Sequence, residues 1–66
     1  MKIITTKVRG WQKRCLEWAV AGNAFEVLGV EKKHILFFQE LCAAYEGKYK
    51  FFSQNKFVLQ FPHHSH

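Results

Sequence analysis

Apolar residues change their spacing along the chain, and each change predicts a new element. The β-branched residues within 2–8 predict a short strand at the start. Residues 11–21 then show the spacing of an amphipathic helix. The apolar stripe of this helix consists of Trp11, Cys15, Trp18 and Ala19. Gly22 and Asn23 predict its end, because both residues tolerate the left-handed backbone found after helices.

The middle of the chain predicts one ambiguous segment and one long helix. Residues 24–30 fit either a short helix or a strand that breaks at Gly29, and we favour the short helix. Residues 31–46 carry the strongest helical pattern, with Glu31 at the start and Gly47 placed to end the helix. The apolar stripe here consists of Ile35, Phe38, Cys42 and Tyr45.

The last part of the chain alternates between apolar and polar positions, which is typical of strands. Residues 53–56 interrupt the alternation as a turn, so we expect a β-hairpin that Pro62 closes. The residues expected on the buried face of the hairpin are Tyr49, Phe51, Phe57, Leu59 and Phe61. The predicted fold is α+β in the order β-α-α-α-β-β, with an N-terminal strand, two to three helices and a C-terminal hairpin. We expect a single globular domain over residues 1–62 and a flexible His-rich tail over residues 63–66.

Length and composition narrow the class of protein. A chain of 66 residues holds one core, and 48% hydrophobic residues are too many for a disordered protein. No apolar run approaches the roughly 20 residues that a membrane helix needs, and the N-terminus lacks the features of a signal peptide. We therefore expect a cytoplasmic protein without a membrane partner. Cys15 and Cys42 are too few and too far apart for a disulfide scaffold, so we expect two buried free thiols.

Charge is distributed unevenly along the chain. The formal net charge is +5, and all five acidic residues are glutamates between Glu17 and Glu46. Both ends of the chain are therefore purely basic, and such ends attract phosphates, acidic proteins or anionic lipids. The simpler alternative is a solvated basic surface that only aids solubility.

Residues 24–38 combine Gly29 with aliphatic residues at the spacing of a tight turn between two helices. The apolar residues of this pattern are Leu28, Val30, Ile35 and Phe38. The segment resembles a helix-turn-helix, and the surrounding order of elements resembles that of Cro-type phage repressors and winged-helix domains. The resemblance implies a small basic nucleic-acid-binding regulator of the phage or mobile-element type. The basic residues expected to contact the DNA or RNA backbone are Lys7, Arg9, Lys32, Lys33, His34, Lys48, Lys50 and Lys56.

A second pattern is the interleaving of aromatic and basic residues within 48–52 and again at Lys56 and Phe57. In one interpretation the rings stack on bases while the lysines neutralise phosphates, and the pattern is similar to the RNP1 strand of RNA-recognition motifs. In the other, the aromatic residues form the buried face of the hairpin and the lysines contact only the nucleic-acid backbone. We favour the second interpretation.

The helix predicted over residues 31–46 has more apolar surface than one face can bury. Leu36 and Phe37 lie where a base-reading helix would carry polar side chains. These two residues, with Glu40, form the alternative site, an exposed patch that docks an acidic host protein or a second copy of the chain. The alternative function is that of a protein-binding inhibitor or adaptor, and a homodimer stays open.

The chain offers little for catalysis or metal binding. It contains no Asp, and His34 with either cysteine is the only conceivable pair of base and nucleophile. Cys42 lies more than two helical turns from His34, so we expect no enzyme and no cofactor. The histidines of the tail are His63, His64 and His66, and nothing in the sequence positions them, so we expect no metal site.

Overall fold

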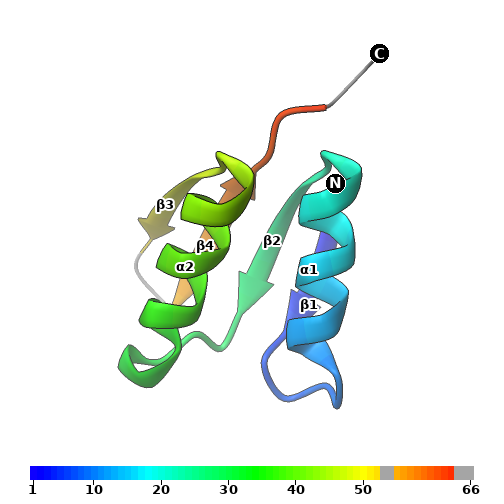
Figure 1. The fold of residues 1–66 in the computed structure, drawn as a ribbon. Coiled ribbons are helices and arrows are strands. Elements are labelled where there is room, and N and C mark those ends of the chain that lie inside the picture. The colour runs from blue at the N-terminus through cyan, green and yellow to red at the C-terminus, as the bar shows by residue number, and fades with distance from the viewer. Residues whose placement is uncertain (53–54, 64–66) are drawn as a thin grey trace.

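The computed structural model describes residues 1–52 and 55–63. These residues form a small α+β fold in which two helices lie on one side of a four-stranded mixed sheet (Figure 1). The helices are α1 (Trp11–Ala21) and α2 (Ile35–Tyr45), and the short 3-10 helix η1 (Lys32–His34) leads into α2. The strands are β1 (Lys2–Thr5), β2 (Ala24–Leu28), β3 (Lys48–Phe52) and β4 (Lys56–Gln60). The observed order is therefore β-α-β-α-β-β.

The sheet joins segments that are distant in the sequence. Its strand order is β1-β2-β4-β3, so β2 and β4 occupy the centre and β1 and β3 the edges. The pair of β1 and β2 is parallel, and α1 makes the crossover between them. The other two pairs are antiparallel. The predicted C-terminal hairpin is thus confirmed as β3 and β4, and the predicted first strand ends earlier than expected, at Thr5.

The prediction of a short helix over residues 24–30 is wrong, because residues 24–28 form the strand β2. Phe25 and Val27 are fully buried and alternate with the half-buried Ala24 and Glu26, which is the burial pattern of a strand. Pairing with β1 on one side and β4 on the other overrides the weak local preference. The resemblance to a helix-turn-helix fails for the same reason, since a strand stands where its first helix was expected.

A capping structure is found at the end of α1 and another before the start of α2. Helix α1 has the predicted bounds and is followed by Gly22 in the left-handed conformation, with φ of 77°. Before α2, Glu31 and His34 form a capping box in which the Glu31 N–H donates to His34 Nδ1 at 2.9 Å. The predicted long helix is therefore confirmed from Ile35 to Tyr45, with a 3-10 turn in place of its first residues.

The core lies between the helices and the sheet and is rich in aromatic rings. The buried side chains are Cys15, Ala19, Phe25, Val27, Val30, Phe38, Leu41, Cys42, Phe57, Leu59 and Phe61. The Phe38 ring packs 4.9 Å from the Phe57 ring, which joins α2 to the centre of the sheet. Both cysteines are buried free thiols, as expected, and burial raises the pKa of Cys15 to about 12.

The hairpin buries its expected face only in part. Phe57, Leu59 and Phe61 are buried, whereas Tyr49 is 41% and Phe51 is 55% exposed. Both exposed residues belong to β3, which is an edge strand with a neighbouring strand on one side only.

The expected flexible tail covers residues 63–66, of which residues 64–66 lie outside the described residues. Within residues 1–52 and 55–63, no helix is long and apolar enough to span a membrane.

Candidate functional site

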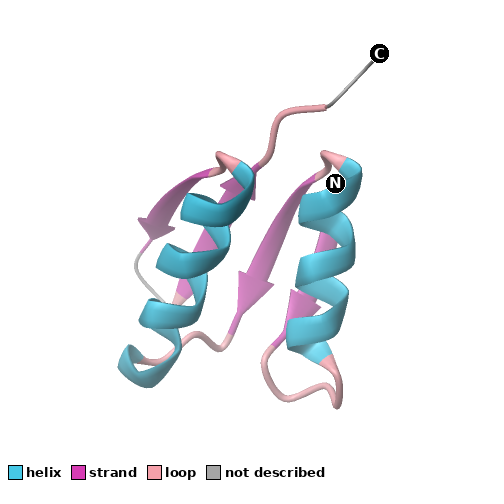
Figure 2. Cartoon of the chain, in the orientation of Figure 1, coloured by secondary structure: helices cyan, strands magenta, loops and turns pink. Residues whose placement is uncertain are grey.

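The sheet has one face that no described residue covers, because both helices pack on the opposite side (Figure 2). Side chains alternate along a strand, so every second residue of each strand points to this uncovered side. We call this surface the open face. Its residues are Lys48, Lys50 and Phe52 of β3, Lys56, Val58 and Gln60 of β4, Ala24, Glu26 and Leu28 of β2, and Ile3 and Thr5 of β1.

Strand register arranges the open face into a basic half and an apolar half. On the β3 and β4 side, Lys48 pairs with Gln60, Lys50 with Val58, and Phe52 with Lys56. On the β1 side, the exposed Ile3 and Leu28 supply an apolar surface. The three lysines therefore gather on the half of the sheet that the hairpin forms.

The Phe52 ring lies at one end of the basic half, at the last residue of β3. It is 39% exposed, and the Nζ atoms of Lys50 and Lys56 each lie 5.5 Å from its centroid. Both distances are within the range of cation–π attraction, which holds the two ammonium groups beside the aromatic ring. Two ammonium groups thus accompany an exposed aromatic ring.

Glu26 is the one acidic residue on the described part of the open face. Its carboxylate lies 3.3 Å from Lys56 Nζ, and its side chain is only 19% exposed. The pair neutralises part of the charge of Lys56 and leaves Lys48 and Lys50 as the stronger centres of positive charge.

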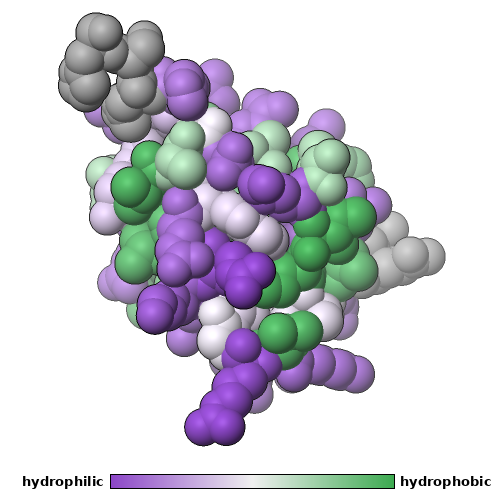
Figure 3. Space-filling model, turned by 90° about the vertical axis from the view of Figure 1, so that its right-hand side faces the viewer, coloured by the Kyte–Doolittle hydropathy of each residue, from purple (hydrophilic) through white to green (hydrophobic). Residues whose placement is uncertain are grey.

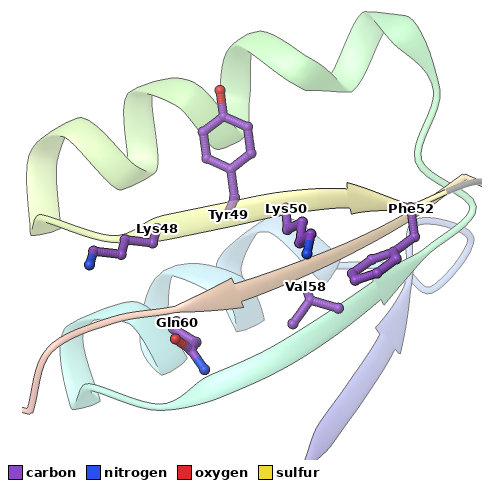
Figure 4. A pocket seen from close by; sticks show the side chains of 6 residues that line it. All are labelled: Lys48, Tyr49, Lys50, Phe52, Val58 and Gln60. Atoms are coloured by element: carbon purple, nitrogen blue, oxygen red, sulfur yellow. The ribbon is translucent and has the colours of Figure 1, made fainter.

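The basic half also contains a shallow hollow of about 210 Å³ (Figure 4). In Figure 4 the Tyr49 ring points toward α2, whereas Lys50, Phe52 and Val58 lie on the other side of the sheet. The residues that line the hollow are Lys48, Tyr49, Lys50, Phe52, Val58 and Gln60. Apolar atoms dominate the lining, and the polar side-chain groups are two lysines, the Tyr49 hydroxyl and the Gln60 amide.

The predicted nucleic-acid residues separate into two groups. Lys48, Lys50 and Lys56 lie together on the open face. The other members of the set lie at the end of the molecule where the helices begin: Lys7 and Arg9 before α1, and Lys32, Lys33 and His34 in η1. The Trp11 and His34 rings, 5.2 Å apart, hold these two segments together. From the side of α1 and β1, hydrophilic side chains project at this lower end (Figure 3).

The predicted protein-docking residues do not form one patch. Leu36 is 63% exposed and Glu40 is also exposed, one helical turn further along α2. Phe37, however, is half-buried, with its ring 5.3 Å from Trp11 and 5.2 Å from Phe38. Its apolar surface is largely used to pack α2 against α1.

Sequence analysis named the lysines of the open face. It considered the rings within residues 48–52 as a stacking surface but favoured another interpretation, and it did not include Phe52, Glu26 or Gln60 among the expected site residues. The missing information was which alternate residues of each strand point to the core and which point to the open face. Once Phe57 and Leu59 are assigned to the core, Gln60 must point to the open side, and its cross-strand pairing brings Lys48 to the same side. Glu26 was missed because its segment was interpreted as a helix.

The structure was also searched for a metal site, and the chain was compared with known proteins. Among the residues that the structure describes, no three His, Cys or Glu side chains lie close enough to hold a metal ion. Comparisons of the chain with protein-family models, with curated proteins and with solved structures found no match.

Proposed function

We propose that the protein binds nucleic acid through the basic half of the open face. The observation that carries the proposal is the placement of Lys50 and Lys56 next to the exposed Phe52, with Lys48 further along β3 on the same uncovered sheet face. Lysines supply charge for phosphates, and an exposed ring supplies a stacking surface for bases. A surface with both features suits nucleic acid better than it suits a purely anionic partner.

The charge of the whole chain supports the same partner. A formal net charge of +5 attracts polyanions over a distance, and the open face carries three lysines against one glutamate. The basic residues at the start of the helices add to this long-range attraction. A regulatory role in a phage or mobile element stays a prediction, and it no longer has a helix-turn-helix to support it.

The alternative of a protein-binding inhibitor or adaptor has weaker support. It depended on Leu36 and Phe37 as one exposed patch, and Phe37 packs instead against Trp11 and Phe38. A single exposed leucine is common on protein surfaces and needs no partner to explain it.

Two triple variants with equal loss of charge test the proposal. In the first, Lys48, Lys50 and Lys56 become Gln; in the control, the exposed Lys7, Lys13 and Lys33 become Gln. Fluorescence anisotropy with labelled single-stranded and duplex oligonucleotides measures affinity over a range of salt concentrations. We expect the first variant to lose most binding and to lower the slope of log K against log salt by about 2.

The control variant should lose less affinity, because its lysines act only through long-range attraction. Circular dichroism and thermal unfolding of both variants verify that they fold. The proposal is wrong if the native chain shows no binding at low salt. It is equally wrong if both variants lose the same affinity at every salt concentration.

A further inference from the structure

We infer that the ligand of the open face is a single strand of nucleic acid, which stacks one unpaired base on the Phe52 ring. The inference rests on the proposed function and names its substrate class. Four features of the open face lead to it: the surroundings of Phe52, the adjacent hollow, the position of both helices on the opposite side of the sheet, and the spacing of Lys48 and Lys50.

Phe52 is placed as a stacking platform with two lysines next to it. Lys56 is its direct cross-strand neighbour, and Lys50 lies two residues before it on the same face of β3. Both ammonium groups lie 5.5 Å from the ring centroid. A base that stacks on this ring takes the place of an ammonium over the ring face, and the long lysine side chains can then reach the phosphates next to the base.

The hollow beside Phe52 fits the edge of such a base. Val58 supplies an apolar wall, and the Gln60 amide supplies a donor and an acceptor. The volume of about 210 Å³ suits a single flat ring system. A base inside a duplex has its faces covered by its neighbours and its pairing edge occupied, so only an unpaired base can enter.

The shape of the open face disfavours a duplex. Proteins that read duplex DNA insert a helix or a two-stranded ribbon into a groove about 12 Å wide. Both α1 and α2 lie on one side of the sheet (Figure 2), and the open-face lysines Lys48, Lys50 and Lys56 point to the other side. In Figure 4 α2 lies on the side of Tyr49, and Lys50 points away from it. In the described residues, nothing projects from the lysine side that would enter a groove.

The spacing of the lysines suits an extended strand. Lys48 and Lys50 lie two residues apart on β3, which is about 6.6 Å along the strand. This spacing is similar to the distance between neighbouring phosphates in an extended nucleic-acid strand. A strand that runs along β3 thus meets Lys48, Lys50 and the Phe52 ring in succession.

A pair of neighbouring phenylalanines provides a matched test. Phe52→Leu keeps an apolar side chain on the open face and removes the π surface. Phe51→Leu makes the same change at a residue that is also exposed but points to the helix side of β3. Affinity is measured by anisotropy with labelled oligothymidine, oligouridine and a mixed-sequence duplex of equal length.

We expect the native chain to bind the single strands more tightly than the duplex. Phe52→Leu should weaken single-strand binding by roughly 5-fold or more, within the range of about 5- to 150-fold that loss of one stacked base produces. Phe51→Leu should change it less than twofold. A 2-aminopurine base within the oligonucleotide should be quenched by the native chain and not by the Phe52→Leu variant.

The outcomes separate this inference from the proposed function. Tighter binding to the duplex, with the open-face lysines still required, overturns the single strand and leaves nucleic-acid binding intact. Single-strand binding that Phe52→Leu does not change overturns the stacked base. Absence of binding to all three oligonucleotides overturns both proposals. Because Phe52 lies outside the core, thermal unfolding of both variants should match that of the native chain within a few degrees.

Discussion

The ammonium of Lys56 lies 3.3 Å from the carboxylate of Glu26, across the two central strands of the sheet. Glu26 comes from β2 and has no other described lysine or arginine within ion-pair distance. In the proposed complex the same ammonium faces a phosphate. Glu26 therefore competes with the ligand for Lys56 and weakens binding that the other lysines support.

Replacement of Glu26 by Gln should tighten nucleic-acid binding. The change frees Lys56 and removes a negative charge from the open face. A partly exposed ion pair contributes about 1 kcal/mol, so we expect a gain of roughly 2- to 5-fold. Anisotropy with oligothymidine measures it. Glu40→Gln, an equal change of charge at an exposed position on α2, is the control and should have a smaller effect. Weaker binding by Glu26→Gln would contradict the assignment of Glu26 as a competitor.

Two glycines with the same backbone conformation should differ in their tolerance of a side chain. Gly10 and Gly22 have φ of 79° and 77°, so Ala at either position carries a similar strain of about 1–2 kcal/mol. A Cβ at Gly22 would lie 2.6 Å from the His63 Cα and 2.7 Å from the Pro62 carbonyl oxygen, whereas a Cβ at Gly10 would have nothing within 4 Å among the described atoms. Urea unfolding should show a larger loss of stability for Gly22→Ala. Equal losses would mean that residues 62–63 move aside without cost.

The buried thiols should make the protein less stable at alkaline pH. Burial raises the pKa of Cys15 from 9.0 to about 12 and also raises the pKa of Cys42. Above pH 9 the unfolded chain loses thiol protons that the folded chain retains, so the free energy of unfolding falls as pH rises toward 12. Urea unfolding between pH 8 and pH 10 measures the slope.

Cys15→Ala is the control for this pH dependence. It removes the more strongly shifted thiol, so its free energy of unfolding should fall less steeply above pH 9 than that of the native chain. A thiol reagent should react slowly with the native protein and rapidly in urea. Identical slopes for the two proteins would show that other groups cause the alkaline loss.

Neighbouring residues of α2 should differ sharply in their contribution to stability. Phe38 is fully buried against Phe57 and Trp11, so Phe38→Ala should cost about 3–5 kcal/mol, which is most of the stability of a domain this small. Leu36→Ala should stay within about 0.5 kcal/mol of the native chain because Leu36 is exposed. Thermal unfolding followed by circular dichroism compares them. A large loss for Leu36→Ala would indicate that this side chain is covered by a second copy of the chain.

The elements with strong local patterns could be predicted from the sequence, and β2 could not. Helix α1 has a clear apolar stripe and a glycine at its end, and it has the predicted bounds. Strand β2 has five residues, of which Ala24, Glu26 and Leu28 favour helices in isolation. Its conformation is decided by pairing with Lys2–Thr5 and Lys56–Gln60, which are far away in the sequence.

The same distinction applies to the candidate site. Lys48, Lys50 and Lys56 were found because charge is visible in a sequence. That these lysines share one surface with Phe52 depends on which residues of β3 and β4 point away from the helices, and the sequence alone does not show this. Lys32 was expected to act with them but belongs to η1, at the end of the molecule where α2 begins.

Along β4, residues that stabilise the core alternate with residues that form the outer surface. Phe57 and Leu59 maintain the core, while Val58 and Gln60 face outward. Mutations that change the outward residues should alter what the surface recognises while leaving the fold intact. The open face could therefore diversify rapidly during evolution, and a library that randomises only its outward positions should yield folded proteins with new ligands.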